Sequence, residues 1–380
     1  MANITDEYRK AAVHDGLFWP DYRTARAEAG FSWRVSSSQY TLMGMLGWGP
    51  PDILRDPERC IELYRRGRPI AARRLPEEFG ETAISTPAIS YGHANGLGCP
   101  LRFPEEQGEV GVVHAYEDVS LEETIEAASA DYDWATLGEA PYYIDYYREL
   151  QDAFPGENVG FAFGKEGPVT TAYELRGDQL FYDLMLEPEK TRRLFVALAE
   201  SAVSFERFRE RVMHGEPQGP NPEGGGMCDD VAAMVPADRF EDLVLPAWDR
   251  YYRGMTTGRR SMHVEDLRRE QLRFVQAIGV SSYDPSVSPK LTPRVIADEI
   301  EVPFGWRLNC THYPQRDCAA VREWVFHAVA DGASSVFTAV SATMCEEWTL
   351  AKVRAFIAAA TEAEEQLEAG RPRAQVSASH

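Results

Sequence analysis

Cysteine and basic residues are both scarce in this chain of 380 residues. Its 6 cysteines form no CxxC pair and no dense spacing, which argues against a disulfide scaffold and is typical of the reducing cytoplasm. Lysine and arginine number 39 against 60 acidic residues, so the formal net charge is -21. Such a surface repels phosphate backbones and anionic lipid, and we expect neither nucleic acid nor a membrane surface as a partner.

Long apolar runs and nucleotide-binding signatures are absent as well. No run of about 18 apolar residues occurs, and the polar segment 1–16 lacks the apolar core of a signal peptide. Gly92, Gly96 and Gly98 do not fit the GxGxxG spacing, and no P-loop lysine follows the glycines at 224–226. These absences disfavour a dinucleotide-binding fold, and we expect a cytoplasmic protein.

From about Glu81 onward, short apolar segments of strand length alternate with long amphipathic ones. In the segment 191–212, apolar residues recur at spacings of one helix face, and 350–367 has the same pattern. The expected strands are 110–113, 159–163, 225–229, 261–264, 280–283, 302–306 and 334–340. Such alternation predicts parallel β–α units, in either an open doubly wound sheet or a closed barrel. The length and the number of units favour an α/β fold of the (β/α)8, TIM-type barrel class.

The two ends of the chain differ from this regular pattern. Glycine and proline clusters such as 47–51 interrupt the first residues, with a helix-like run at 57–66. We therefore expect an irregular, helical N-terminal extension (1–80) packed on the barrel (81–370). The polar segment 371–380 is expected to fray.

Polar residues that can bind a proton or a metal follow five successive expected strands, where a barrel of this class carries its chemistry. His263 and Glu265 are two positions apart, so on a strand they point to the same face. Cys345 follows the last expected strand. An imidazole, a carboxylate and a thiolate make a three-ligand zinc site with one open position. The alternative is a buried histidine paired with its carboxylate, beside an unrelated cysteine.

Further candidates come from the same strand ends and from two other segments. Asp230 and Asp284 are candidate general acids or bases, and Asn309 and His312 could donate hydrogen bonds to a substrate. The alternatives are caps, salt bridges and loop structure. His93 in a glycine-rich loop and Tyr173 in the segment 167–177 are candidates for substrate binding.

Several motifs, in the right order, resemble those of uroporphyrinogen decarboxylase-like proteins over roughly residues 50 to 370. They are the segments 95–99, 167–177, 180–183 and 187–189, and Asp229-Asp230 followed by Phe240 and Pro246. The resemblance implies a (β/α)8 barrel with its active site at the C-terminal ends of the strands.

The resemblance is closer to one branch of this superfamily than to the other. True uroporphyrinogen decarboxylases use an aspartate in a strand-end motif, whereas this chain has no acidic residue from Thr82 to Pro104. The zinc-dependent methyltransferases, similar to methylcobalamin:coenzyme M methyltransferases, carry His-x-Cys and a second cysteine in the last β–α loop. Here His263-Val264-Glu265 takes the place of His-x-Cys, and Cys345 that of the second cysteine. The glutamate is a harder ligand and makes the metal more Lewis acidic.

The leading hypothesis is therefore a zinc-dependent methyl- or alkyltransferase in which His263, Glu265 and Cys345 hold Zn²⁺. The resemblance implies a methylated corrinoid as a candidate donor and a corrinoid protein as a candidate partner, beside a small-molecule substrate. One alternative is a cofactor-free decarboxylase or lyase acting on a small carboxylate, with Asp229 or Asp230 orienting the substrate. Another is a barrel that binds a ligand without catalysis. Monomer and homodimer both remain open.

Overall fold

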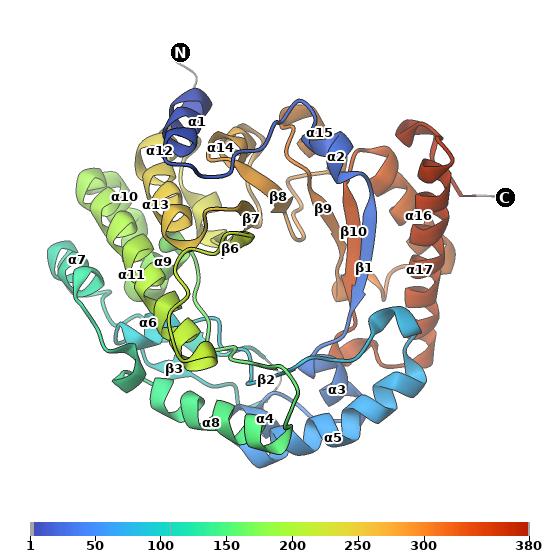
Figure 1. Cartoon of the computed structure of the whole chain (residues 1–380), viewed down its shortest axis with the longest axis horizontal. Coiled ribbons are helices and arrows are strands. Elements are labelled where there is room, and N and C mark those ends of the chain that lie inside the picture. Colours follow the sequence, from blue (N-terminus) through green and yellow to red (C-terminus); the bar gives the residue numbers. More distant parts are fainter. Residues whose placement is uncertain (1–3, 107, 379–380) are drawn as a thin grey trace. The chain divides into compact units, whose positions relative to one another are not determined.

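The chain forms two compact units, each assembled from two separate stretches of sequence. The computed structural model describes residues 4–106 and 108–378. The first unit comprises Met1–Pro20 and Ile84–Ser281, and the second comprises Asp21–Ala83 and Ser282–His380. Figure 1 shows their elements coloured along the chain.

Parallel strand pairs dominate the first unit. The strands are β2 (Ile84–Ser85), β3 (Leu101–Arg102), β4 (Gly111–Val112), β5 (Val159–Gly160), β6 (Gly224–Cys228) and β7 (Arg259–His263). β2 pairs in parallel with β5, β6 pairs in parallel with β7, and β3 pairs antiparallel with β4. The chain leaves this unit within β8 (Val280–Asp284).

Helices of the first unit cover these strands. They are α1 (Ile4–His14), α6 (Gly92–Gly96), α7 (Leu121–Ser129), α8 (Ala140–Ala153), α9 (Pro168–Arg176), α10 (Gln179–Leu186), α11 (Pro188–His214), α12 (Ala237–Leu243), α13 (Leu245–Met255) and α14 (Leu272–Ala277). Short 3-10 turns lie at Trp134–Thr136, Asp230–Met234 and Arg269–Gln271.

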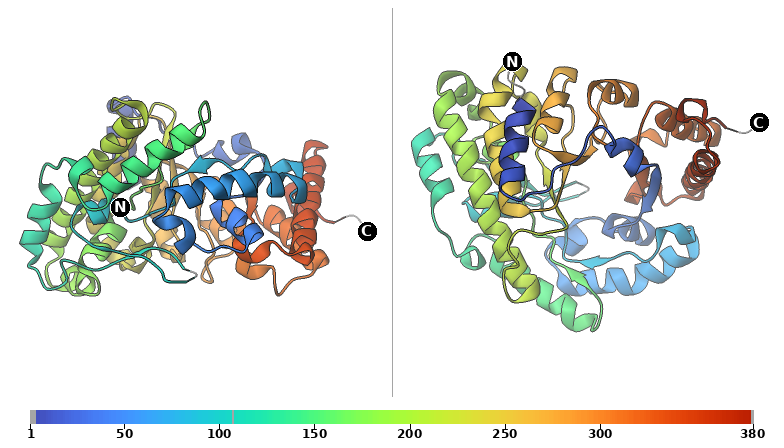
Figure 2. Two further views of the ribbon diagram at one scale, coloured as in Figure 1. Left: turned by 90° about the horizontal axis from the view of Figure 1, so that it is seen from below. Right: turned by 45° about the horizontal axis from the view of Figure 1, so that its top comes forward.

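The long helix α11 organises this helical layer, and its apolar face is the one that the sequence predicts. It begins with a proline at its first position and ends before Gly215, whose φ of 84° suits a helix terminus. Leu194, Leu198 and Phe205 are buried along one side. That side packs on α7, α9 and α13, and both views of Figure 2 keep α11 (yellow-green) beside α13 (yellow).

The second unit contains one parallel sheet and a helical layer. The strands are β1 (Ser32–Ser36), β9 (Gly305–Leu308) and β10 (Ser335–Ala339), with β10 between the other two. The helices are α2 (Ala25–Ala29), α3 (Gln39–Leu46), α4 (Pro51–Leu54), α5 (Pro57–Arg74), α15 (Pro293–Glu299), α16 (Cys318–Ala330) and α17 (Glu347–Glu368). The 3-10 turns are Glu77–Phe79, Cys310–His312, Ala342–Met344 and Arg373–Gln375. α16 and α17 pack against each other, as the red helices of Figure 2 show.

The α/β class with parallel strands is confirmed, but a complete barrel is not observed. Within residues 4–106 and 108–378 no sheet closes on itself. In the same part of the chain, no helix is both long and apolar enough to cross a membrane.

The chain ends do not divide as expected. The segment 1–80 is not one extension, because residues up to Pro20 belong to the first unit and Asp21–Ala83 to the second. The reason is β1, whose backbone completes the ladder beside β10 and whose Val35 is buried. The tail is not frayed from residue 371 either. Arg373 donates hydrogen bonds to the carbonyls of Ala333 and Gly30, and Val376 is buried.

Candidate metal centre

The parallel pair β6 and β7 places two strand ends side by side in the first unit (Figure 1). Their register pairs the Cα atoms of Cys228 and His263. Beyond that pair the backbone amide of Asp229 donates to the carbonyl of His263 at 3.1 Å. The residues that follow each strand are therefore held next to each other, as the carboxyl ends of parallel strands require.

Asp230, His263 and Glu265 form a cluster of ligand atoms at these strand ends. His263 Nε2 lies 3.8 Å from Asp230 Oδ1 and 3.7 Å from Glu265 Oε1. One ligand atom of each residue lies within 4.8 Å of the others, and all three side chains are partly exposed. Among residues 4–106 and 108–378 they form the one such group of histidine, cysteine and acidic residues. The spacing of His263 and Glu265 thus has the predicted result, while metal binding stays a prediction.

Asp230 also fixes the turn that carries Glu265. Its Oδ1 accepts a hydrogen bond from the Glu265 backbone amide at 2.7 Å. Because one carboxylate oxygen positions a neighbouring ligand, Asp230 can orient the cluster as well as belong to it.

Asp229, adjacent in sequence, points the other way and is fully buried. Its Oδ1 accepts from the Thr170 backbone amide at 2.7 Å, and its Oδ2 accepts from Trp248 Nε1 at 2.6 Å. Burial raises the pKa of Asp229 to about 7. Asp229 therefore anchors the turn after β6 to α9 and α13, and this position contradicts the alternative in which it orients a substrate.

Two glutamates that the sequence analysis missed surround the cluster. Burial, together with the charges of Asp230 and Asp229, raises the pKa of Glu166 to about 8. Glu174 is 4 % exposed, and within the described chain neither of its carboxylate oxygens has a hydrogen-bond partner. Burial first, then Glu166 and Asp229, raise the pKa of Glu174 well above its usual value. Glu166 could have been found from sequence, since it follows the strand segment 159–163 closely.

The surroundings of the cluster fit a divalent cation. Carboxyl groups outnumber the one imidazole, and the raised pKa values show that burial and mutual repulsion oppose their ionisation. A bound cation would relieve that repulsion. Imidazole nitrogen and carboxylate oxygen are both regular zinc ligands, so His263 with Glu265 and Asp230 provides a suitable donor set.

His93 does not reach a substrate, contrary to the prediction. Its side chain is 0 % exposed, and its Nε2 lies 2.9 Å from Ser201 Oγ. The ring packs edge-on against Trp134 at 5.4 Å between centroids. Burial, followed by the charge of Lys165, lowers the pKa of His93 to about 3. The glycine-rich loop is part of α6 in the core, so His93 stabilises the fold.

Tyr173 lies on α9, the helix whose first turn holds Asp229. Its ring packs edge-on against His114 at 5.3 Å and is tilted against Phe181 at 5.8 Å. These contacts give it a packing role, and substrate binding by Tyr173 stays a prediction.

The other predicted site residues belong to the second unit. Asp284 Oδ1 accepts from the Ser286 backbone amide at 2.8 Å, and Asn309 Oδ1 accepts from the Thr311 backbone amide at 3.1 Å. Burial, then Arg316, lowers the pKa of the half-buried His312. These contacts order the local loops, and the predicted roles of Asp284, Asn309 and His312 remain untested.

Cys345 is 7 % exposed, and its thiol is already engaged in the second unit. Its Sγ donates to the carbonyls of Thr41 at 3.5 Å and Ser341 at 3.6 Å. Burial raises the pKa of this thiol, although Arg74 opposes the shift. Such surroundings favour the neutral thiol over the thiolate that a metal needs.

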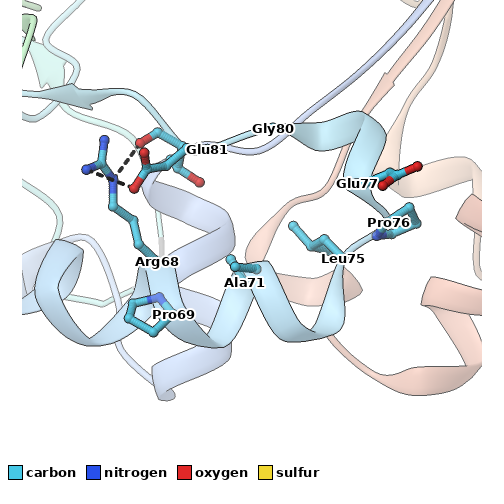
Figure 3. A pocket seen from close by; sticks show the side chains of 10 residues that line it. Arg68, Pro69, Ala71, Leu75, Pro76, Glu77, Gly80 and Glu81 are labelled. Carbon is cyan, nitrogen blue, oxygen red and sulfur yellow. Dashed lines mark hydrogen bonds and ion pairs between the residues drawn. The ribbon is translucent and has the colours of Figure 1, made fainter.

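A hollow of about 380 Å³ lies beside α5 in the second unit (Figure 3). Pro69, Ala71 and Leu75 give it apolar walls. The guanidinium of Arg68 is engaged, since Nε donates to the Thr82 carbonyl at 2.8 Å and Nη1 lies 3.2 Å from Glu81 Oε1. No group of metal-binding side chains occurs among these described lining residues, so the hollow is not the candidate site.

Comparison with known proteins gives a likeness in structure only. No family model matches the chain, and no curated protein matches it in sequence. One similar solved structure is a methyltransferase from Methanosarcina mazei. The match has a TM-score of 0.61 and 16% sequence identity, and it covers 88% of this chain and 92% of that one. The two chains share a fold.

Proposed function

We propose that this protein is a metal-dependent methyl- or alkyltransferase. The observation that carries the proposal is the cluster of Asp230, His263 and Glu265 at the ends of β6 and β7, which suits a divalent cation. The fold shared with a methyltransferase supports the reaction class, as does the resemblance to the zinc-dependent branch of the uroporphyrinogen decarboxylase-like superfamily. In this proposal the two units together make a (β/α)8 barrel, and the substrate is a small molecule.

Zinc is the proposed metal, with His263 and Glu265 as ligands and a cysteine as the sulfur donor. Cys345 is the cysteine that the family resemblance indicates. When bound, zinc would act as a Lewis acid and lower the pKa of a coordinated thiol or water. A methylated corrinoid, presented by a corrinoid protein, is the proposed methyl donor.

The residues of the chain itself would position and hold protons. His263 offers a ring nitrogen to the cation, and Asp230 keeps Glu265 in place through its backbone amide at 2.7 Å. Glu166, whose pKa of about 8 leaves it protonated near neutral pH, is the nearby group best suited to give a proton. Asp230 and Asp284 remain proposed acid–base groups.

The test is elemental analysis of purified protein, with titration of zinc into chelator-treated protein. We expect one zinc per chain in the wild type and loss of that zinc in His263→Ala. His14→Ala is the matched control, since His14 is exposed and remote from β7 in the sequence. Circular dichroism must show that both variants fold. A folded wild type that binds no stoichiometric metal would contradict the proposal.

A second candidate is a cofactor-free decarboxylase or lyase. The observation in its favour is Glu166, a protonated carboxyl beside the ionisable cluster that could donate a proton without a metal. This function predicts turnover that survives a chelator and the loss of His263. Turnover that depends on added zinc would exclude it.

A further inference from the structure

Cys228 lies on the same face of the β6–β7 ladder as His263. The two are register partners, as are Met227 and Met262 one position earlier. Met227 and Met262 are 3 % and 2 % exposed, so they face the core. Side chains alternate along a strand and partners across a parallel pair share a face, so Cys228 and His263 project together to the opposite side. Cys228 is exposed there.

The two strand ends thus present two matching pairs of ligand residues. Cys228 and Asp230 are two positions apart on one chain segment, and His263 and Glu265 are two apart on the other. The register joins Cys228 to His263, and the 2.7 Å hydrogen bond joins Asp230 to Glu265. Neighbouring strands lie about 4.8 Å apart. A sulfur, an imidazole and two carboxylates therefore meet at one edge of the sheet.

We propose that Cys228 supplies the thiolate ligand of the metal, with His263 and Glu265 as its partners and Asp230 as the positioning residue. This inference rests on the proposed function and changes the identity of its sulfur donor. The ligand atoms that already lie within 4.8 Å of one another belong to Asp230, His263 and Glu265. Rotation of Cys228 about its Cα–Cβ bond directs Sγ toward them.

The surroundings of the two cysteines favour Cys228 over Cys345. Cys345 is enclosed and donates to two backbone carbonyls, which a metal ligand would have to give up. Cys228 is exposed, and the ammonium group of Lys165 interacts with it electrostatically. A nearby positive charge stabilises a thiolate. Both strands of the ladder belong to the first unit, so the site needs no residue from elsewhere.

The ligand set has a consequence for the substrate. One thiolate, one imidazole and one carboxylate leave a tetrahedral position open. The thiolate makes the metal softer than an all-oxygen-and-nitrogen set would, which suits a thiol as the fourth ligand. A thiol is therefore the class of acceptor that this site would take.

The experiment is cobalt substitution in wild type, Cys228→Ser and Cys345→Ser. Co²⁺ bound by a thiolate gives a near-ultraviolet charge-transfer band, which reports the sulfur independently of activity. We expect the band in wild type and Cys345→Ser, and its loss in Cys228→Ser. Competition with a chelator should show zinc affinity falling by at least about tenfold in Cys228→Ser, the lower end of the effect of removing an outer-shell partner.

The outcomes separate this inference from the proposed function. Metal bound at one per chain with a band that persists in Cys228→Ser, is lost in Cys345→Ser, or never forms would overturn the role of Cys228 and leave the metal centre intact. Failure of the wild type to bind metal would overturn the proposed function instead. Cys228→Ala provides a second variant, and circular dichroism of each metal-free protein checks folding.

Discussion

At the scale of single residues, the candidate centre depends on the side of the strand to which each side chain points. Asp229 and Asp230 are neighbours, yet one is buried against Thr170 and Trp248 while the other lies 3.8 Å from His263. The buried carboxylate fixes the turn, and the exposed one faces the cluster. Chemistry and packing are thus divided between adjacent residues.

The structural role of His93 gives a pH-dependent prediction. Its native pKa of about 3 lies below the value of about 6.5 for an unfolded histidine. Between these values the unfolded state binds more protons, so the free energy of unfolding falls as pH decreases below about 6.5. Relative to His93→Gln, the wild type should lose up to about 1.4 kcal/mol per pH unit in that window.

Urea unfolding of metal-free protein at pH values from about 7.5 to about 5.5 measures this difference. His14→Gln is the matched control, because that histidine is exposed, and it should keep the wild-type pH dependence. Equal pH dependence in wild type and His93→Gln would show that His93 is not held neutral by burial.

At the scale of elements, the close approach of α9 to the end of β6 aligns the site. Gly167 precedes α9, and its backbone amide donates to the Cys228 carbonyl at 2.5 Å. A Cβ atom at Gly167 would meet Asp229 Cβ and Cγ at 2.5 Å. The contact is too short for any side chain, so the helix can sit this close only on a glycine.

Substitution of that glycine should therefore destabilise the first unit. We expect Gly167→Ala to lower the free energy of unfolding by about 1–3 kcal/mol, the usual cost of overpacking. Gly111→Ala is the control, since its Cβ would meet the flexible end of Arg102 at 3.3 Å, and it should change stability by less than about 0.5 kcal/mol. Urea unfolding compares them. Equal stability of the two variants would mean that α9 shifts freely.

At the scale of the whole molecule, the cluster belongs to one of two units that are each discontinuous in sequence. Asp230, His263 and Glu265 lie in the first unit, and Cys345 lies in the second. Zinc binding stabilises whatever segments hold it, by about 2.7 kcal/mol at a hundredfold excess over Kd. The segments that gain stability therefore identify the ligands.

Hydrogen exchange with and without zinc reads out this distribution. We expect slower exchange in 224–230 and 259–265, and in the first turn of α9. The β1–β10–β9 sheet serves as the internal control and should not change. Protection of the segment 341–347 would show that Cys345 binds the metal after all, and would contradict a site built on β6 and β7 alone.

Periodic patterns made most elements predictable. The helix expected at 191–212 is α11, and the strands expected at 261–264 and 334–340 are β7 and β10 within a few residues. β1 escaped prediction because Ser32–Ser36 has one buried side chain, Val35, between breaker-rich segments. Its stability comes from pairing with β10, about three hundred positions later in the chain.

The sequence by itself determined the α/β class and the pairing of His263 with Glu265, because both follow from local periodicity along the backbone. Only the tertiary structure decided which neighbours those residues have. It brought Asp230 and Cys228 beside them, surrounded them with Glu166 and Glu174, and buried His93 in the core. The physical reason is that strand register, burial and electrostatic repulsion depend on residues far apart in the chain, which no local pattern records.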